Sequence, residues 1–542
     1  MKLTLPDVPK SEQTPLVTEL LGIIAQLIEQ VQFQQEQITQ LKDEIRVLKG
    51  LKKRPVFKPS KLDAQTTNDE QTAPSAKKSS ATVKKTDDDP QYQELKPDRI
   101  EIIKPAGAIP PGSRFKGYKN FDVQELVLLS ETVRYRMERW LTADGQVLSG
   151  QLPAGLRAGK HGRHFGPNLL SYILYQHHHC QVTQPLLLEQ LREWGIRLSS
   201  GQLNRLLIED KERFHAEKDD LLRAGLSHGH VTVDDSGARH QGRNGYVTQI
   251  GNEFFAWFSS TQSKSRVNFL TLLQGEHASY VINESALQYM RQQKLPRELL
   301  GKVALKSNES MNEKLWQEWL ASLAISRRKH QQTVLEGALL GALLERDEIR
   351  HLAVVSDGAP QFSVLQHGLC WVHAERQVHN LNPAGEQQRK AVERVRKRIW
   401  VLYRALKAYQ RAPTAKRAKQ LSSLFDRIFR QKTVYVLLNR LLKRLREHKD
   451  ELLLVLKRPE VPLHTNGSER DIRDYVKKRK VSGGTRSDEG RRCRDTFISL
   501  KKTCRKLGLS FWKYLQERIK GSPHIPLAEL ITLQQKGSIA TT

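Results

Sequence analysis

The sequence contains little cysteine. Its four copies, Cys180, Cys370, Cys493 and Cys504, are far apart and form no Cys-x-x-Cys pair. This spacing argues against a disulfide framework and against a cysteine-rich zinc site, because both need cysteines at short intervals. We therefore expect reduced thiols, as in a cytosolic protein.

Long apolar segments are also scarce. No apolar run approaches the roughly 18 residues that a membrane helix needs. The first residues, MKLTLPDVPKSEQTP, lack the apolar centre of a signal peptide. We therefore expect neither a membrane partner nor export.

Acidic residues are outnumbered by basic ones. The chain has 89 Lys and Arg against 59 Asp and Glu, which gives a formal net charge of +30 at pH 7. Solubility does not require so large a surplus, and a polyanion is the natural partner of such a chain. The charge favours nucleic acid over an acidic protein or an anionic membrane surface.

The N-terminal 50 residues contain a heptad pattern. Eight of its nine seam positions are apolar. A sustained period of 3.5 residues predicts a coiled coil, and hence a homo-oligomer, although an amphipathic helix folded against its own chain would show a similar pattern. The seam positions are Leu20, Ile24, Leu27, Val31, Gln34, Ile38, Leu41, Ile45 and Leu48.

A linker and a helical region follow. Residues 51–95 are rich in Lys, Ser, Thr, Asp and Pro and predict a flexible basic tether. Residues 96–228 are mostly helical by period. Within them Pro185 starts one helix, Gly195 ends it, and Ser199 or Ser200 caps the next. A helix-turn-helix of this kind would present Gln202, Asn204 and Arg205 to DNA, although helical hairpins are also common as purely structural elements.

Strand patterns begin at residue 230. HVTVDD, GYVTQIG and EFFAWFSS predict three strands, with a hairpin turn at Gly251-Asn252. HLAVVSDG predicts a further strand, a long basic helical segment follows, and a late helix begins near HTNGSERDIRDYVKKRK. The fold class is therefore α/β, interrupted by helical insertions.

Three acidic sites stand out in this basic chain. Asp234 or Asp235 ends the first strand, Asp357 ends a later strand, and Glu469 opens the late helix. Functional groups collect at strand ends in α/β sheets, and carboxylates are the ligands that Mg²⁺ prefers. Three such acids would hold two Mg²⁺ ions for phosphodiester cleavage or strand transfer.

Each acid also has an ordinary interpretation. Asp234-Asp235 and Asp357 precede small or glycine residues and are compatible with plain turns. Glu469 stands three residues after Asn466, which is the spacing of a helix capping box. Glu284, in VINES, is a rival second acid at another predicted strand end.

Four blocks resemble the Asp-Asp-Glu transposases of bacterial insertion sequences, and within them the insertion-sequence sixty-six family. They are VDDSGARHQG, SKSRVNFLTLL, SDGAPQF…LCWVHAER and NGSERDIRDYVKKRKVSGGTRSDEGRRCRDTFISLKKTCRKLGLSFWKYL. The resemblance implies a ribonuclease-H-like catalytic core, dependence on Mg²⁺ (with Mn²⁺ as a substitute), and binding to the terminal inverted repeats of a mobile element. It also implies cleavage of DNA 3′ ends and their joining to target DNA.

The resemblance places the catalytic, metal-binding triad at Asp234, Asp357 and Glu469. Many relatives have Asp-Glu-Thr at the first acid, where this chain has Asp234-Asp235-Ser236, so Asp235 stays an alternative there. His373, in CWVHAER, is a candidate accessory residue or a packed core histidine. Many relatives also carry a cysteine-rich zinc segment that this chain lacks, so zinc is not expected.

Basic residues that follow Glu469 are candidates for phosphate contact, because their charges adjoin the predicted site and nearby glycines permit close backbone approach. The basic segment 376–460 is expected to lie along DNA, although a solvated helix face would look the same. The candidates after Glu469 are Lys477, Lys478, Arg479, Lys480, Arg486, Arg491 and Arg492.

These patterns together predict a cytoplasmic, nucleoid-associated bacterial DNA transposase that acts on double-stranded element ends and target DNA. The alternatives are a non-catalytic DNA-binding regulator derived from a transposase, and a nuclease without strand joining. The expected segments are a coiled-coil helix (1–50), a linker (51–95), a helical DNA-binding region (96–228), a catalytic core (229–375, with a helical insert at 285–348), a basic helical insertion (376–460), the C-terminal part of the core (461–520) and a tail (521–542).

Overall fold

The structure is a computed structural model that describes residues 14–48, 99–103, 113–115, 118, 130–153, 165–275, 278–535 and 537. The chain divides into two units, one of Met1–Lys53 with Arg134–Thr542 and one of Arg54–Val133. All the helices and strands below belong to the first unit. The predicted linker at 51–95 lies outside the described residues.

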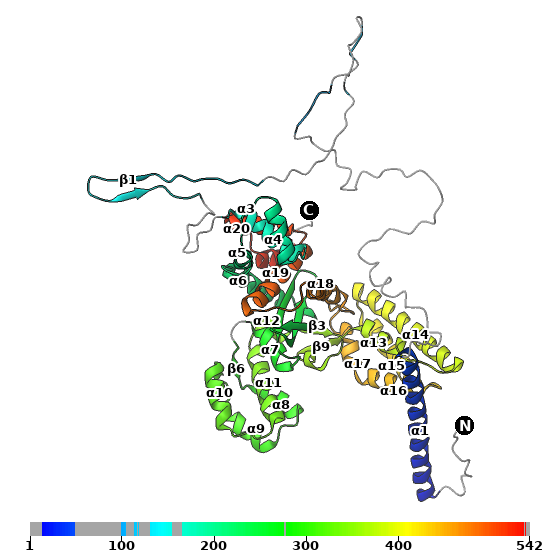
Figure 1. The fold of residues 1–542 in the computed structure, drawn as a ribbon. Helices are drawn as coiled ribbons and strands as arrows, with labels where there is room; N and C mark the ends of the chain where they lie inside the picture. The colour runs from blue at the N-terminus through cyan, green and yellow to red at the C-terminus, as the bar shows by residue number, and fades with distance from the viewer. Residues whose placement is uncertain are drawn as a thin grey trace. The chain divides into compact units, whose positions relative to one another are not determined.

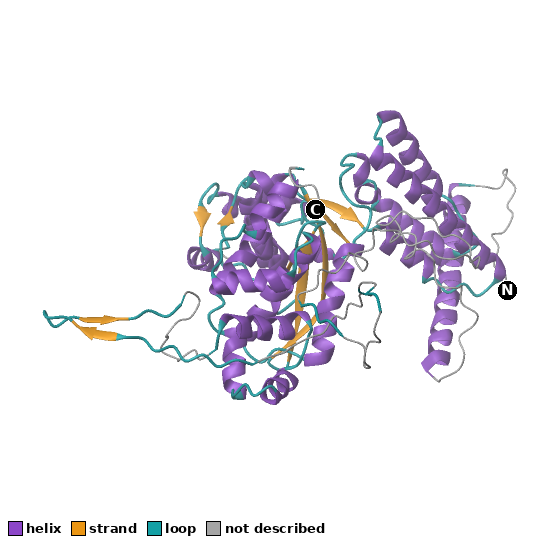
Figure 2. Ribbon diagram, turned by 90° about the horizontal axis from the view of Figure 1, so that it is seen from above, coloured by secondary structure: helices purple, strands orange, loops and turns teal. Residues whose placement is uncertain are grey.

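A five-stranded mixed sheet forms the centre of this unit, with helices around it (Figures 1 and 2). Its strand order is β5-β4-β3-β8-β9; β3, β4 and β5 are antiparallel, and β8 and β9 run parallel to β3. The predicted α/β class is confirmed. The bounds are β3 His230–His240, β4 Arg243–Gly251, β5 Ala256–Thr261, β8 Ala353–Ser356 and β9 Gln366–Leu369.

Strand β3 is longer than its sequence pattern predicts. It pairs with β8 only as far as Thr232, but it continues antiparallel to β4 until His240 meets Arg243. Gln241 and Gly242, both with positive φ, form the hairpin turn. The prediction that the strand ends at Asp234 or Asp235 is therefore wrong, because pairing with β4 holds Ser-Gly-Ala in an extended conformation that these residues do not favour on their own.

Helix α19 (Asp488–Lys506) covers the edge strand β5. Three of its side chains, spaced by four residues, accept hydrogen bonds from alternate backbone N–H groups of β5. A sheet edge otherwise exposes a row of such unpaired groups, so the helix closes this edge. The bonds run from Ser260 N to Asp495 (2.7 Å), from Phe258 N to Ser499 (2.9 Å) and from Ala256 N to Thr503 (3.2 Å).

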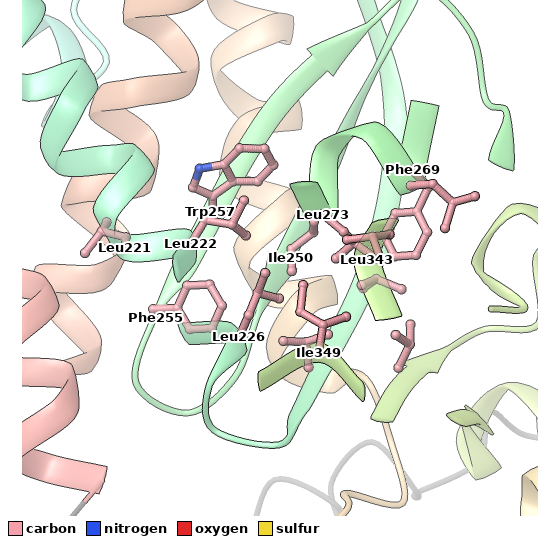
Figure 3. Packing of buried hydrophobic residues seen from close by; sticks show 14 of the residues in the cluster. Leu221, Leu222, Leu226, Ile250, Phe255, Trp257, Phe269, Leu273, Leu343 and Ile349 are labelled. Atoms are coloured by element: carbon pink, nitrogen blue, oxygen red, sulfur yellow. The ribbon is translucent and has the colours of Figure 1, made fainter. Parts of the chain in front are cut away.

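An apolar layer joins the sheet to α6 (Glu212–Leu226) and α7 (Arg266–Gln274), as Figure 3 shows. Ile250 and Trp257 are paired neighbours on β4 and β5. Burial of each large apolar side chain stabilises the fold by about 1.5–3 kcal/mol. The other residues labelled in this layer are Leu221, Leu222, Leu226, Phe255, Phe269, Leu273, Leu343 and Ile349.

The crossover from β5 to β8 carries the first helical insertion. Its longest helix, α11, packs against α7 and α8. A Cβ on Gly341 would lie 2.3 Å from the Val281 carbonyl oxygen, so α11 approaches β6 only because this residue is glycine. The elements are β6 Tyr280–Val281, α8 Glu284–Gln292, α9 Arg297–Ala304, β7 Ser310–Met311, α10 Glu313–Ser322, α11 Arg328–Leu344 and α12 Asp347–Arg350.

The second, basic insertion is helical as predicted and follows β9. Its helices bury apolar residues such as Leu402, Phe425 and Leu442 against one another. Figure 1 shows these helices (yellow to orange) apart from α8–α11 (green). The elements are η4 Pro360–Phe362 before β9, then α13 Trp371–His379, α14 Glu386–Arg411, α15 Ala415–Phe429, α16 Val436–Glu447, α17 Lys449–Leu452 and η5 Leu454–Leu456.

The region before the sheet holds the predicted helical hairpin. Pro185 lies in the first turn of α4 (Gln184–Glu193), Gly195 after this helix has a positive φ, and Ser199 caps α5 (Ser200–Ile208), as the sequence predicts. Residues 139–149 contain no helix; β1 (Arg139–Leu141) and β2 (Val147–Ser149) form a hairpin around the turn residue Gly145. Helices α3 Pro167–Leu174, η3 Tyr175–His179, α18 Asn466–Ser482, α20 Phe511–Lys520 and α21 Leu527–Gln535 complete the unit.

Helix α1 spans Pro15–Leu48, where the sequence predicts a heptad helix. Its seam residues Leu20, Leu27 and Ile38 are 48%, 59% and 51% exposed. The 20-residue segment Leu16–Gln35 is long and apolar enough to cross a membrane, so the expectation that no run approaches this length is wrong here. Its glutamates would be costly in a bilayer. Part of α1 contacts α16 of the same chain, where Arg440 lies 3.5 Å from the centre of the Phe33 ring and donates to Gln30 at 3.3 Å. The alternative of a helix packed against its own chain therefore has support, and the coiled coil stays a prediction.

Candidate active site

Strand register brings Asp234 and Asp357 together. Thr232 of β3 pairs with Val355 of β8 in a parallel ladder. Two residues further along the two strands come Asp234 and Asp357, and neighbouring strands lie about 4.8 Å apart. The two aspartates therefore adjoin each other where the parallel pairing ends, and Asp357 acts electrostatically on Asp234.

Helix α18 brings Glu469 to the same face of the sheet. The Thr232 hydroxyl lies 2.6 Å from that of Ser468, in the first turn of α18. Side chains two residues apart on a strand share a face, so Asp234 points to the same side as Thr232. Glu469 follows Ser468 directly and also acts electrostatically on Asp234.

The pKa of Asp234 is raised to about 6. Burial is the largest cause, the negative charges of Asp357, Asp235 and Glu469 add to it, and a hydrogen bond from Asp235 N opposes it. A buried acid among other acids is costly to ionise unless a cation joins it. This concentration of carboxylate oxygens suits a hard divalent cation.

Asp235 faces away from this cluster. One carboxylate oxygen pairs with Lys264, and the other accepts a hydrogen bond of 2.7 Å from Gln361 Nε2. Both oxygens of Asp235 are therefore engaged on the opposite face of β3, whereas Asp234 lies among the acids. Lys264 and Gln361 were missed by the sequence reasoning, although they stand inside the blocks SKSRVNFLTLL and SDGAPQF.

The carboxylate of Glu469 is only partly satisfied. Its Oε1 is buried and has no hydrogen-bond partner among the described residues. His373 Nε2 lies 3.4 Å and Arg376 Nη1 3.9 Å from this oxygen, and Arg473 lies 3.4 Å from Oε2. The capping-box interpretation is wrong, because the helix cap is Thr465 and no side chain caps the helix end.

His373 lies on α13, beside the Glu469 carboxylate. Burial lowers the pKa of its imidazole, but contact with buried Cys370 and the charge of Glu469 outweigh burial and raise it.

Asp357 also takes part in a turn, as the alternative interpretation predicts, because its Oδ1 accepts a 3.0 Å hydrogen bond from Ala359 N. Glu284 lies elsewhere, 75% exposed at the start of α8 and paired with Arg291.

A second group of predicted residues lines a cavity of about 700 Å³ between α4–α5 and α18–α19. Asn204, Lys478 and Arg486 all line it, although they come from two segments that the sequence could not connect. Arg494 and Lys501 also line it and were missed; their seven-residue spacing places them on one face of α19. The cavity is therefore rich in positive charge.

Several residues that were predicted to contact DNA make hydrogen bonds within the protein instead. Gln202 accepts a 2.8 Å hydrogen bond from Ser199 N and completes a capping box. Lys478 is buried and donates to His177 O at 2.7 Å; burial, with Arg494 and Lys501, lowers its pKa to about 7. Arg479 donates to Gly237 O.

The remaining candidates lie nearer the surface. Lys477 pairs with Asp474 and Arg491 with Asp488. The exposed residues among the predicted contacts are Arg205, Lys477, Lys480, Arg486 and Arg492.

The glycine loop after α18 has a structural role that the sequence did not reveal. A Cβ on Gly484 would lie 2.5 Å from Arg239 O. Thr485 N donates to Arg239 O at 2.9 Å, and Gln241 N donates to Thr485 O at 2.8 Å. Gly484 therefore lets the loop backbone approach the end of β3, whereas the sequence analysis expected the glycines to permit an approach to DNA phosphate.

The fold and the site together define an α/β protein with neighbouring acids at its sheet and a net charge of +30, which suits a polyanionic partner. Residues 350–492, which include Asp357, His373 and Glu469, match a family model described as "Transposase IS66 family". The chain belongs to this transposase family. It is 44% identical over 317 residues to "Uncharacterized protein y4jO" of Sinorhizobium fredii (strain NBRC 101917 / NGR234), covering 57% of this chain and 99% of that protein. No solved structure matches the chain.

Proposed function

We propose that this protein is a DNA transposase that binds the terminal inverted repeats of an insertion sequence and catalyses metal-dependent 3′-end cleavage and strand transfer. The observation that carries the proposal is geometric: the register of β3 and β8 places Asp234 beside Asp357, and the contact of Thr232 with Ser468 brings Glu469 to the same face. These acids are 357 − 234 = 123 and 469 − 357 = 112 residues apart in the chain. Membership in a transposase family supports DNA binding and DNA cleavage in general.

The three acids fit a pair of Mg²⁺ ions, with Mn²⁺ as a substitute. Their oxygens are hard ligands. A cation would bind the buried Oε1 of Glu469, which accepts no hydrogen bond from the described residues, and would relieve the crowded charge around Asp234. When bound, two such ions stabilise charge on the attacking and leaving oxygens of an in-line displacement.

Neighbouring side chains position these ligands. Lys264 and Gln361 hold Asp235, and through it the part of β3 that carries Asp234. His373 lies beside Glu469 and is placed to orient its carboxylate. Arg376 and Arg473 supply positive charge next to Glu469, where a DNA phosphate would need it.

The finer architecture is part of the same proposal. The connectivity of the sheet, three antiparallel strands and then two parallel ones, supports a ribonuclease-H-like core. The exposed seam of α1 supports subunit pairing. The basic cavity beside α5 and the basic helices α14–α16 support binding of element ends and target DNA, in the cytoplasm at the nucleoid.

Incubation of the protein with candidate element ends and Mg²⁺, followed by mapping of the cut phosphates, tests the proposal. Asp357→Ala should abolish 3′-end cleavage and leave DNA binding largely intact. Glu284→Ala is the matched control, because Glu284 is an exposed acid outside the cluster, and it should cleave as the wild type does.

The other outcomes are distinguishable. Normal cleavage by Asp357→Ala would remove this residue from the site. Cutting by the wild type without a joined product would indicate a nuclease. DNA binding by the wild type without any cutting, in Mg²⁺ or Mn²⁺, would indicate a regulator.

A further inference from the structure

Three potential metal ligands meet at the start of β3, the end opposite to the acids. His228 lies in the turn after α6, His230 begins β3, and Glu253 lies in the turn between β4 and β5. Thr232 pairs with Gly251, and the same antiparallel register places His230 opposite Glu253. Gly229, with a φ of +87°, separates the two histidines.

The ligand atoms are already close together. His228 Nε2 lies 3.0 Å from Glu253 Oε1, and His230 Nε2 lies 3.3 Å from Glu253 Oε2. One ligand atom from each of the three residues can be chosen so that all lie within 4.8 Å of one another. Zinc bonds of about 2.0–2.2 Å in a tetrahedron separate the ligand atoms by about 3.3 Å, so only small side-chain movements are needed.

The histidine beside Glu253 is able to change its tautomer. The side chain of His230 is only 5% exposed, and its Nδ1 has no hydrogen-bond partner within the described ranges. Without a metal Nε2 donates its proton to Glu253, and when Nε2 binds a cation the free Nδ1 is able to carry the ring proton instead. Phe254 packs edge-on against the His228 ring, with the ring centres 4.9 Å apart, and holds that ring beside Glu253.

The local charges are compatible with a bound cation. The Glu253 carboxylate accepts a hydrogen bond from each imidazole, so both of its oxygens face the two ring nitrogens. Arg458 donates to Gly229 O nearby, and its charge is balanced by an ion pair with Glu460. Glu253 is half exposed, which leaves room for water as a fourth ligand.

We propose that His228, His230 and Glu253 form a zinc-binding site that ties the start of β3 to the β4–β5 turn. Two imidazoles and one carboxylate suit zinc, whereas the all-carboxylate cluster at Asp234 suits magnesium. The four residues from His230 to Asp234 span about 13 Å of strand, so the two sites are separate. The site does not depend on the proposed DNA cleavage.

Metal analysis of the untagged full-length chain tests this site. The protein is stripped with a chelator, loaded with Zn²⁺, passed through gel filtration and analysed for zinc per chain. Wild type should retain one equivalent, and His228→Gln should lose it. His524→Gln, a change at an exposed histidine elsewhere, should keep it.

Two further measurements keep the test decisive. Zn²⁺ should raise the melting temperature of the stripped wild type but not that of His228→Gln. Glu253→Gln, an isosteric change at a half-exposed position, should also lose the zinc and serves if His228→Gln does not fold. Retention of a full equivalent by a folded His228→Gln or Glu253→Gln, or no zinc in the wild type, would overturn the proposal.

Discussion

Replacing Asp234 with asparagine should stabilise the metal-free fold. The pKa of this carboxyl is raised from an ordinary 3.8 to about 6, chiefly by burial. Each tenfold change in proton affinity corresponds to about 1.4 kcal/mol, so keeping Asp234 ionised at pH 8 costs the folded state about 3 kcal/mol as an upper bound. Asparagine keeps an oxygen for the hydrogen bond from Asp235 N and carries no charge.

The pH dependence has a definite sign. The folded state holds this proton more tightly than the unfolded chain, so the destabilisation begins as pH rises above 3.8 and is complete above about 6. In EDTA, Asp234→Asn should therefore melt above the wild type at pH 8 and close to it below pH 4. Differential scanning calorimetry at the two pH values measures the difference.

Asp235→Asn is the matched control for this experiment. Asp235 pairs with Lys264 and accepts a hydrogen bond from Gln361, so removing its charge should leave stability unchanged or lower it. Added Mg²⁺ should raise the melting temperature of the wild type and have little effect on Asp234→Asn. A lower melting temperature for Asp234→Asn than for wild type at pH 8 in EDTA would refute the reasoning.

Three further predictions follow from other parts of the molecule. Arg486→Ala, at the rim of the basic cavity, should weaken DNA binding and reduce the slope of log K against log salt by about one, as measured by fluorescence anisotropy. Gly341→Ala should lower the melting temperature, because its Cβ would clash with Val281 O, whereas Gly301→Ala, which meets open space, should not. Leu27→Glu should lower the oligomer mass in light scattering if α1 pairs subunits, and an unchanged mass would exclude that role for the seam.

Local sequence patterns predicted much of the secondary structure. The start of α4, the turn after it and the cap of α5 follow from Pro185, Gly195 and Ser199, whose preferences act within one helical turn. Strands β3, β4, β5 and β8 follow from runs of β-branched and aromatic residues, whereas β9 (QHGL) has no such run and was not predicted. The hairpin at 139–149 was missed although Asp144-Gly145 is a strong turn signal, because the helical period around it dominated the prediction.

The candidate site was predicted only in part. The sequence, with its family resemblance, singled out Asp234, Asp357 and Glu469, and strand alternation alone implies that Asp234 and Asp235 face opposite sides. The sequence could not show which face of the sheet α18 packs against, and therefore which of the two aspartates lies beside Glu469. That depends on the contact between Thr232 and Ser468, which are 236 residues apart.

The sequence by itself determined the positive charge, the α/β class and the cap of α5, and it singled out Asp357, Glu469 and the pair Asp234-Asp235 as candidates. Composition, neighbouring residues and family motifs are enough for each of these. Only the tertiary structure decided which aspartate joins the cluster, that Lys478 is buried, and that Glu253 meets His228 and His230. The physical reason is that these outcomes depend on the register between strands and on helix docking. Both are set by the packing of residues that are remote in the chain.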